Sequence, residues 1–203
     1  TTVNVVGGAA AAASAGDATF TFKATTGTSD SATLNLEAAL INDVTIAGVE
    51  TVTINSGGTG ANLLADLVVA NASTINVTGD QNLTITAEVD MADTAVTTTG
   101  AIDGTVNASG MTGALNFTPN ASDNMQMTGG SGDDTFAMTT GLDKYDLLDG
   151  GTGTDTVSVT AVADDASLDL STYSFTSIET VSVTGAAGGA DDPVDITIAA
   201  DAA

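Results

Sequence analysis

Two nine-residue stretches of this 203-residue chain, at positions 129–137 and 150–158, follow the pattern Gly-Gly-x-Gly-x-Asp-x-U-x, in which U is a large apolar residue. Glycines allow positive φ angles, so each stretch turns tightly, and the residues after the aspartate begin a strand. The turn aims carbonyl oxygens inward beside the aspartate carboxylate. Such a set of oxygens suits a hard divalent cation that takes six or more ligands.

Short β-prone runs recur about every ten residues from position 75 on, separated by Gly, Asn, Asp and Ser. Two runs per coil give a coil of about 20 residues, the repeat length of a solenoid whose stacked coils bury one continuous core. Aromatic residues make up 3% of the chain, which suits a narrow interior. The sequence therefore predicts an all-β fold, a parallel β-helix (β-solenoid). A β-sandwich, which has similar turn spacing, is the alternative. The runs lie around Ile75, Leu83, Val96, Val106, Leu115, Met125, Phe136, Leu147, Val157 and Leu168, with others around Val181 and Ile196.

The first part of the chain is less regular. Residues 18–23 alternate Thr and Phe and predict a strand, whereas residues 31–41 fit either a short helix or two strands. We therefore expect residues 1–45 to form a strand-containing segment and residues 46–203 to form a Thr-rich solenoid with its special turns at 129–158. The strand-like ends at 3–6 and 194–199 are candidates for joining neighbouring subunits.

Charge limits the possible partners. The chain has 26 acidic and 2 basic residues and a net charge of −24, so neither nucleic acid nor an anionic bilayer is an expected partner. No apolar run is long enough to predict membrane insertion. Self-repulsion of this size destabilises a compact state, and bound cations would relieve it. The chain has no Cys, so disulfides cannot stabilise the fold.

The chain also lacks the usual catalytic side chains. It has no His, no Cys and no Arg, and its only Lys residues are Lys23 and Lys144. The common general bases, zinc ligands and phosphate-binding groups are therefore missing, and we expect no enzymatic activity. Paired carboxylates for glycoside cleavage remain formally available.

The two nonapeptides resemble those of the repeats-in-toxin (RTX) family of secreted bacterial proteins. The Thr-rich segments 48–54, 72–80 and 177–183 narrow the resemblance to calcium-dependent bacterial S-layer and related surface proteins, over roughly residues 43–185. The resemblance implies Ca²⁺ as cofactor, secretion to the cell surface and self-association into a layer or filament, with cell-surface polysaccharide as a further candidate partner. An adhesin stalk or binding module, or the folding and secretion module of a larger enzyme, is the alternative.

The resemblance also implies the metal ligands. The sixth-position carboxylates are those of Asp134 and Asp155, with Asp133 and Asp149 as additional acids. Backbone carbonyls complete the set, from Gly130, Ser131 and Gly132 in the first turn and Gly151, Thr152 and Gly153 in the second.

Two features depart from the family pattern. The motifs begin 21 residues apart, whereas nonapeptides in a regular array recur about every 18 residues per coil, so Asp143 or Asp146 is expected to act as a substitute ligand. Residues 57–62 keep the glycines of the motif but place Asn62 at the sixth position. Because an amide is a neutral and weaker ligand, no calcium is expected there.

Overall fold

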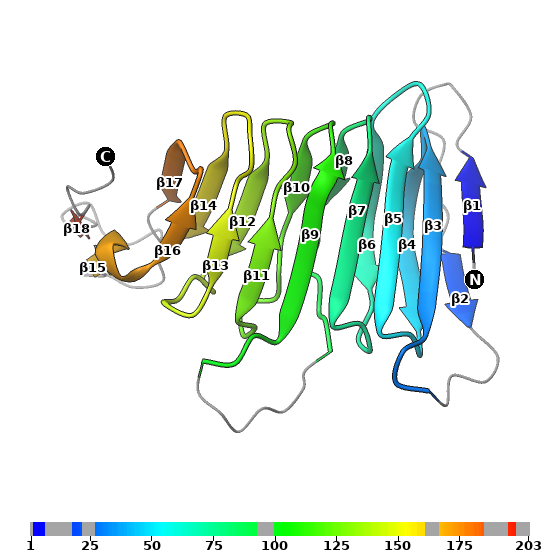
Figure 1. The fold of residues 1–203 in the computed structure, drawn as a ribbon, viewed down its shortest axis with the longest axis horizontal. Coiled ribbons are helices and arrows are strands. Elements are labelled where there is room, and N and C mark those ends of the chain that lie inside the picture. The colour runs from blue at the N-terminus through cyan, green and yellow to red at the C-terminus, as the bar shows by residue number, and fades with distance from the viewer. Residues whose placement is uncertain are drawn as a thin grey trace.

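The chain forms a β-solenoid in which two eight-stranded parallel sheets lie face to face (Figure 1). The computed structural model describes residues 2–6, 18–21, 27–92, 100–160, 167–184 and 195–197. Sheet A contains, in spatial order, β1 (Thr2–Val6), β3 (Ser31–Glu37), β5 (Thr51–Gly57), β7 (Thr74–Gly79), β9 (Gly104–Met111), β11 (Met125–Thr128), β13 (Leu147–Asp149) and β16 (Ser174–Thr176). Sheet B contains β2 (Ala18–Thr21), β4 (Leu40–Ala47), β6 (Asn62–Val68), β8 (Leu83–Ile85), β10 (Leu115–Phe117), β12 (Thr135–Thr139), β14 (Thr156–Thr160) and β17 (Thr180–Thr184).

The chain alternates between the two sheets, so each coil has two corners. We call the segments that lead from sheet A to sheet B the first corner, and those that lead from sheet B back to sheet A the second corner. A small separate sheet pairs β15 (Ser167–Asp169) with β18 (Asp195–Thr197), and a 3₁₀ turn, η1 (Leu170–Thr172), follows β15. The described part of the chain contains no helix long and apolar enough to cross a membrane.

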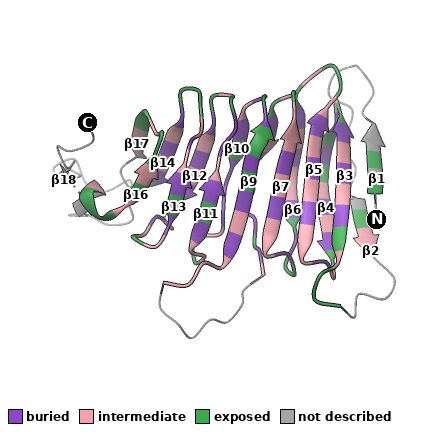
Figure 2. Cartoon of the chain, in the orientation of Figure 1, coloured by how far each residue is buried: buried purple, intermediate pink, exposed green. Residues whose placement is uncertain are grey.

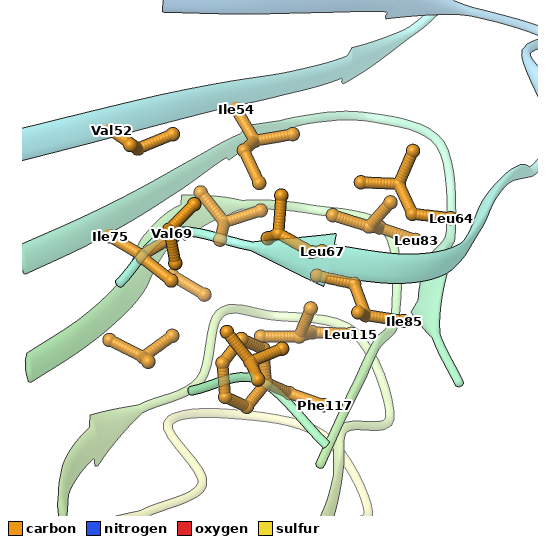
Figure 3. Packing of buried hydrophobic residues seen from close by; sticks show 14 of the residues in the cluster. Val52, Ile54, Leu64, Leu67, Val69, Ile75, Leu83, Ile85, Leu115 and Phe117 are labelled. Atoms are coloured by element: carbon orange, nitrogen blue, oxygen red, sulfur yellow. The ribbon is translucent and has the colours of Figure 1, made fainter. Parts of the chain in front are cut away.

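The core forms because side chains alternate inward and outward along most of the described strands of the main sheets. In β5, for example, Val52 and Ile54 are fully buried, whereas Thr51, Thr53 and Asn55 face outward. Figure 2 shows this alternation of buried and partly exposed residues along the strand. Parallel pairing in register then stacks like on like from coil to coil, and Figure 3 shows the resulting layers. One such ladder in sheet A runs through Ala32, Val52, Ile75, Val106, Met127, Leu148 and Phe175.

The parallel β-helix predicted from the sequence is confirmed, and the β-sandwich is excluded because every strand pair in the described residues is parallel. The expected β-prone runs coincide with strands, except that Val96 lies outside the described residues. The run at Leu168 forms β15, which pairs with β18 and does not join the main sheets.

Of the two alternatives for residues 31–41, the short helix is wrong and the two strands are confirmed. These residues form β3 and the start of β4, because Ala32, Leu34 and Leu36 alternate with polar residues and are buried by the neighbouring coil. β4 spans the expected boundary at residue 45, and both sheets continue across it.

Coil length varies more than the sequence predicts. The sequence separation of residues paired in sheet A ranges from 20, as for Ser31 and Thr51, to 32, as for Thr78 and Gly110. Strand register is fixed by burial, whereas a corner segment is exposed and can lengthen without moving the strands. Apart from a bulge in β9, opposite Asn76 and Thr78, the extra residues therefore lie between strands.

Charge is concentrated at the corners as well. Among the described residues, the two main sheets hold only four acidic side chains, those of Glu37, Asp43, Asp66 and Asp149. The outward positions of the sheets are mostly Thr, Ser, Asn and Ala. The solenoid thus has two broad, nearly uncharged faces joined by acidic corners.

We expect Phe117→Ala to destabilise the fold by about 3–5 kcal/mol, because Phe117 is fully buried and stacks on Phe136 in the next coil. Urea denaturation followed by circular dichroism measures the change. Asn116→Ala, an exposed outward neighbour on the same strand, is the matched control and should change stability by less than about 0.5 kcal/mol. Equal midpoints for the two variants would contradict the assignment of Phe117 to the core.

Candidate metal-binding corner

The two glycine-rich motifs form stacked turns at the first corner. The turn at 129–134 joins β11 to β12, and the turn at 150–155 joins β13 to β14. Backbone hydrogen bonds tie them together: Thr152 N donates to Gly130 O (2.9 Å) and Thr156 N donates to Asp134 O (2.8 Å). The motifs are thus direct neighbours along the solenoid, one coil apart.

Glycine is required in these turns for two reasons. Gly151 and Gly153 have φ angles of 89° and 141°, which side chains rarely tolerate. A β-carbon on Gly129 would overlap both the Gly150 carbonyl oxygen and the Asp134 carboxylate. The missing side chains therefore make room for a close approach of backbone and carboxylate oxygens.

Three acidic side chains link successive coils at this corner. Asp134 Oδ1 accepts a hydrogen bond from Leu115 N, Asp155 Oδ1 accepts one from Asp134 N, and Glu179 Oε2 accepts one from Asp155 N, each at 2.7 Å. Each acid thus reaches back one coil to a backbone N–H that would otherwise lack a partner. We call Asp134, Asp155 and Glu179 the carboxylate ladder.

Asn62 occupies the corresponding place nearer the N-terminus. Its Oδ1 accepts a hydrogen bond from Ala39 N (2.6 Å), and its Nδ2 donates to Ser56 Oγ (2.9 Å) and to Gly57 O (3.1 Å). The buried amide is neutral and both of its ends are satisfied. This turn therefore has no unsatisfied buried charge at the position that Asp134 occupies in the later coil.

Burial sets the electrostatics of the carboxylate ladder. Asp134 and Asp155 are each 1% exposed, and burial raises the pKa of both carboxyl groups above the usual range. The nearby charges of Asp155 and Asp133 raise the pKa of Asp134 further, and those of Glu179, Asp133 and Asp149 raise that of Asp155. Backbone N–H groups oppose the shift. The corner therefore has an excess of negative charge that burial makes costly.

The described residues offer no basic group to neutralise this charge. Lys144 is the single basic side chain among them, and it lies before β13, at the second corner, with its Nζ 4.9 Å from the centre of the Tyr145 ring. Within the described residues, no side chain therefore supplies a positive charge to the carboxylate ladder.

The two buried aspartates differ in how their oxygens are used. Asp134 Oδ2 accepts a second hydrogen bond, from Gly130 N (2.7 Å), so both of its oxygens have N–H donors. Asp155 Oδ2 is buried and has no hydrogen-bond partner. Of the two sixth-position aspartates, Asp155 is therefore the better prepared to bind a metal ion.

The other residues expected from the sequence lie on the same two turns. Asp133 Oδ1 accepts a hydrogen bond from Thr154 N (2.8 Å) and Asp149 Oδ1 accepts one from Gly151 N (3.1 Å). Within the described ranges, no three His, Cys, Asp or Glu side chains converge as a metal-binding group. An ion at this corner would rely on carbonyl oxygens and water beside one or two carboxylates, as calcium sites commonly do.

The expectation that Asp143 or Asp146 substitutes as a ligand is wrong. Both precede β13 at the second corner, the opposite end of that strand from Gly150. Asp146 Oδ1 and Oδ2 accept hydrogen bonds from Met125 N and Asp143 N, both at 2.8 Å. The residues that lengthen this coil are accommodated there, so the two motifs still stack.

Glu179 is the member of the ladder that sequence reasoning missed. Its context did contain a signal, because Asp155 and Glu179 are each followed by Thr-Val-Ser-Val-Thr, and these identical segments form β14 and β17, paired in register. Two identical strands that each follow an acidic residue indicate equivalent corner positions.

A comparison with protein-family models found no match, and comparisons with curated proteins and with solved structures found no significant match either. The fold and the geometry of the first corner define the class of this protein as a β-solenoid with stacked glycine–aspartate turns. Its relation to the RTX family stays a prediction.

Asp146 generates a pH prediction. Burial raises the pKa of this carboxyl from 3.8 to about 6, so the folded state binds a proton more tightly than the unfolded state between about pH 4 and pH 6. The contribution of this carboxyl to the free energy of unfolding is therefore largest at about pH 4 and below. It falls as the pH rises to about 6 and is constant at higher pH. The difference corresponds to roughly 3 kcal/mol.

Urea denaturation at pH 4 and pH 7 in chelator tests this. Compared with Asp146→Ala, the wild-type protein should have a larger advantage at pH 4 than at pH 7. Asp146→Asn keeps one hydrogen-bond acceptor and should be more stable than Asp146→Ala. Because neither variant has the carboxyl, the stability of both should change with pH in the same way. An advantage that does not vary with pH would refute the shift.

Proposed function

We propose that this chain is an extracellular, calcium-stabilised structural protein that assembles with copies of itself into a surface layer or a filament. The observation that carries the proposal is the carboxylate ladder, in which the buried Asp134 and Asp155 and the exposed Glu179 stack with no basic neighbour among the described residues, in a chain of net charge −24. A divalent cation would offset both the local and the overall repulsion.

The chemistry of the corner favours calcium. Its available ligands are carboxylate and carbonyl oxygens, and the chain has no His or Cys to supply nitrogen or sulfur ligands. Calcium takes six to eight oxygen ligands in flexible geometry, and extracellular modules bind it at about 10⁻⁴–10⁻³ M. The residues that would hold it are those expected from the motifs, above all Asp155 with Asp133, Asp134 and Asp149.

Self-assembly is supported by the edges of the main sheets. In the described residues, β1 and β2 each pair on one side only at one end of the solenoid, as do β16 and β17 at the other (Figure 1). Unpaired edges offer N–H and C=O groups to another strand. β17 has the same sequence as β14, to which it binds, so its outer edge repeats a surface that already accepts such a strand.

An adhesin-type binding module is the alternative that a specific feature favours. A shallow groove of about 190 Å³ lies on sheet A across β11, β13 and β16, lined by Gln126, Thr128, Leu147, Asp149, Ser174 and Thr176 among others. Its hydroxyl, amide and apolar groups could contact a neutral cell-surface polysaccharide. Electron microscopy with calcium separates the two functions, because ordered sheets or fibres favour assembly and dispersed rods favour the binding module.

Calcium titration calorimetry tests the metal. We expect Asp134→Ala and Asp155→Ala each to raise the calcium dissociation constant about tenfold or more, because each removes a charge from the corner. Asn62→Ala, in the neutral turn of the same corner, should lower stability but leave the dissociation constant unchanged. If all three variants bind calcium equally well, or if chelator leaves the melting temperature of the wild-type protein unchanged, calcium is not the stabilising ion.

Truncation tests the assembly. Deleting residues 1–8 removes β1 and should abolish polymers in calcium, measured by light scattering and electron microscopy. The truncated protein should still melt at a higher temperature with calcium than without, which shows that the rest of the solenoid is folded. Unchanged polymers would place the subunit contacts on the broad faces instead.

A further inference from the structure

A third turn stacks on the two glycine-rich turns, although its sequence carries no motif. Residues 177–179 join β16 to β17 and lie one coil beyond the turn at 150–155. Gly150 N donates a hydrogen bond to Thr176 O (2.9 Å), and Glu179 N and Thr180 N donate to Asp155 O (3.1 and 3.0 Å). This turn contains Ser177, Ile178 and Glu179 and no glycine.

Ser177 occupies the place of the glycine that it stacks on but has a different backbone conformation. The register pairs Thr128 with Asp149 and Asp149 with Thr176, so Gly129, Gly150 and Ser177 occupy equivalent positions. Ser177 has a φ angle of 51°, in the left-handed region that non-glycine residues seldom adopt. Gly129 and Gly150 do not have such an angle, so the third turn adopts this conformation without a glycine and at some conformational cost.

Stacking of the third turn on the second brings two oxygens together. A β-carbon on Gly150 would overlap both the Ser177 carbonyl oxygen and Asp155 Oδ2, so these oxygens are neighbours on one side of the Gly150 backbone. One coil earlier, Gly129 lies in the same way beside the Gly150 carbonyl oxygen and Asp134 Oδ2. The pair of oxygens thus recurs where the sequence motif does not.

The two positions differ in their hydrogen bonds. Asp134 Oδ2 accepts the N–H of Gly130, but the equivalent N–H of Gly151 donates to Asp149 Oδ1. Asp155 Oδ2 is therefore left with no donor, in a side chain that is 1% exposed. A buried carboxylate oxygen beside a carbonyl oxygen is unfavourable unless a cation lies between them or the carboxyl binds a proton.

We propose that a divalent cation of the calcium class binds between the turn at 150–155 and residues 177–179, at the Asp155 carboxylate and the Ser177 carbonyl. The Glu179 carboxylate, which accepts the Asp155 N–H, adds a second negative charge beside the ion, and water completes the shell. The inference rests on the proposed function, because it takes calcium as the ion. It places the ion between the second nonapeptide and the following turn, which carries no motif.

Calorimetric titration of the full chain with calcium alone tests the proposal. Glu179→Gln keeps the acceptor for the Asp155 N–H but removes the charge, so it should weaken one calcium site about tenfold. Glu37→Gln, an exposed Glu at the end of β3 that leads into the same corner, is the matched control and should bind as wild type. Ser177→Gly keeps the carbonyl and should also retain binding, whereas Asp155→Asn should lose the site.

Three outcomes would overturn the proposal. If Glu179→Gln and Asp155→Asn bind calcium as wild type while Asp133→Asn binds it less tightly, this site fails and the calcium-stabilised function stands. If the wild-type protein binds no calcium, both fail. If Asp155→Asn melts at a higher temperature in chelator and binds calcium unchanged, a proton and not a cation neutralises Asp155. Should Asp155→Asn fail to fold, Glu179→Gln decides, because its side chain is exposed.

Discussion

The structure depends on parallel stacking in register, which places each residue about 4.8 Å from its counterparts in the coils above and below. Inside the solenoid, this stacking places apolar residues on one another, such as Val52 on Ile75, and these side chains need no hydrogen-bond partner. At the corners it leaves backbone N–H groups facing the next coil, and side chains must reach along the axis to accept them. The hydrogen bond from Asp134 N to Asp155 Oδ1 is the model for this interaction.

The same stacking creates the main electrostatic problem of the molecule. An acid that accepts the N–H of the preceding coil comes to lie near the acid of that coil, as Asp155 does beside Asp134. The N-terminal part of the first corner avoids this by using the neutral amide of Asn62. The dependence on cations should therefore be concentrated from residue 129 onward, where the buried acids occur.

Separation of charge from the broad faces links the fold to the proposed assembly. Acids at corners can bind cations, while nearly neutral faces and open sheet edges let copies of a highly acidic protein approach one another. A solenoid achieves this separation because its strands hold register and its corners tolerate charge and insertion, as residues 140–146 do at the second corner. The cation sites and the contacts between copies can therefore lie on different parts of the molecule.

The sequence by itself predicted the solenoid, with a β-sandwich as the alternative, together with most strands from residue 75 on and the two glycine turns, because these depend on local periodicity and on φ angles that glycine allows. The tertiary structure decided which oxygens are free, because the donors come from neighbouring coils. Asp134 receives Leu115 N from 19 residues away, and Glu179 reaches Asp155 N across 24. Those pairings depend on coil length and register, which no single segment encodes. They leave an oxygen of Asp155 without a donor and none of Asp134, although both residues hold the same place in the same motif.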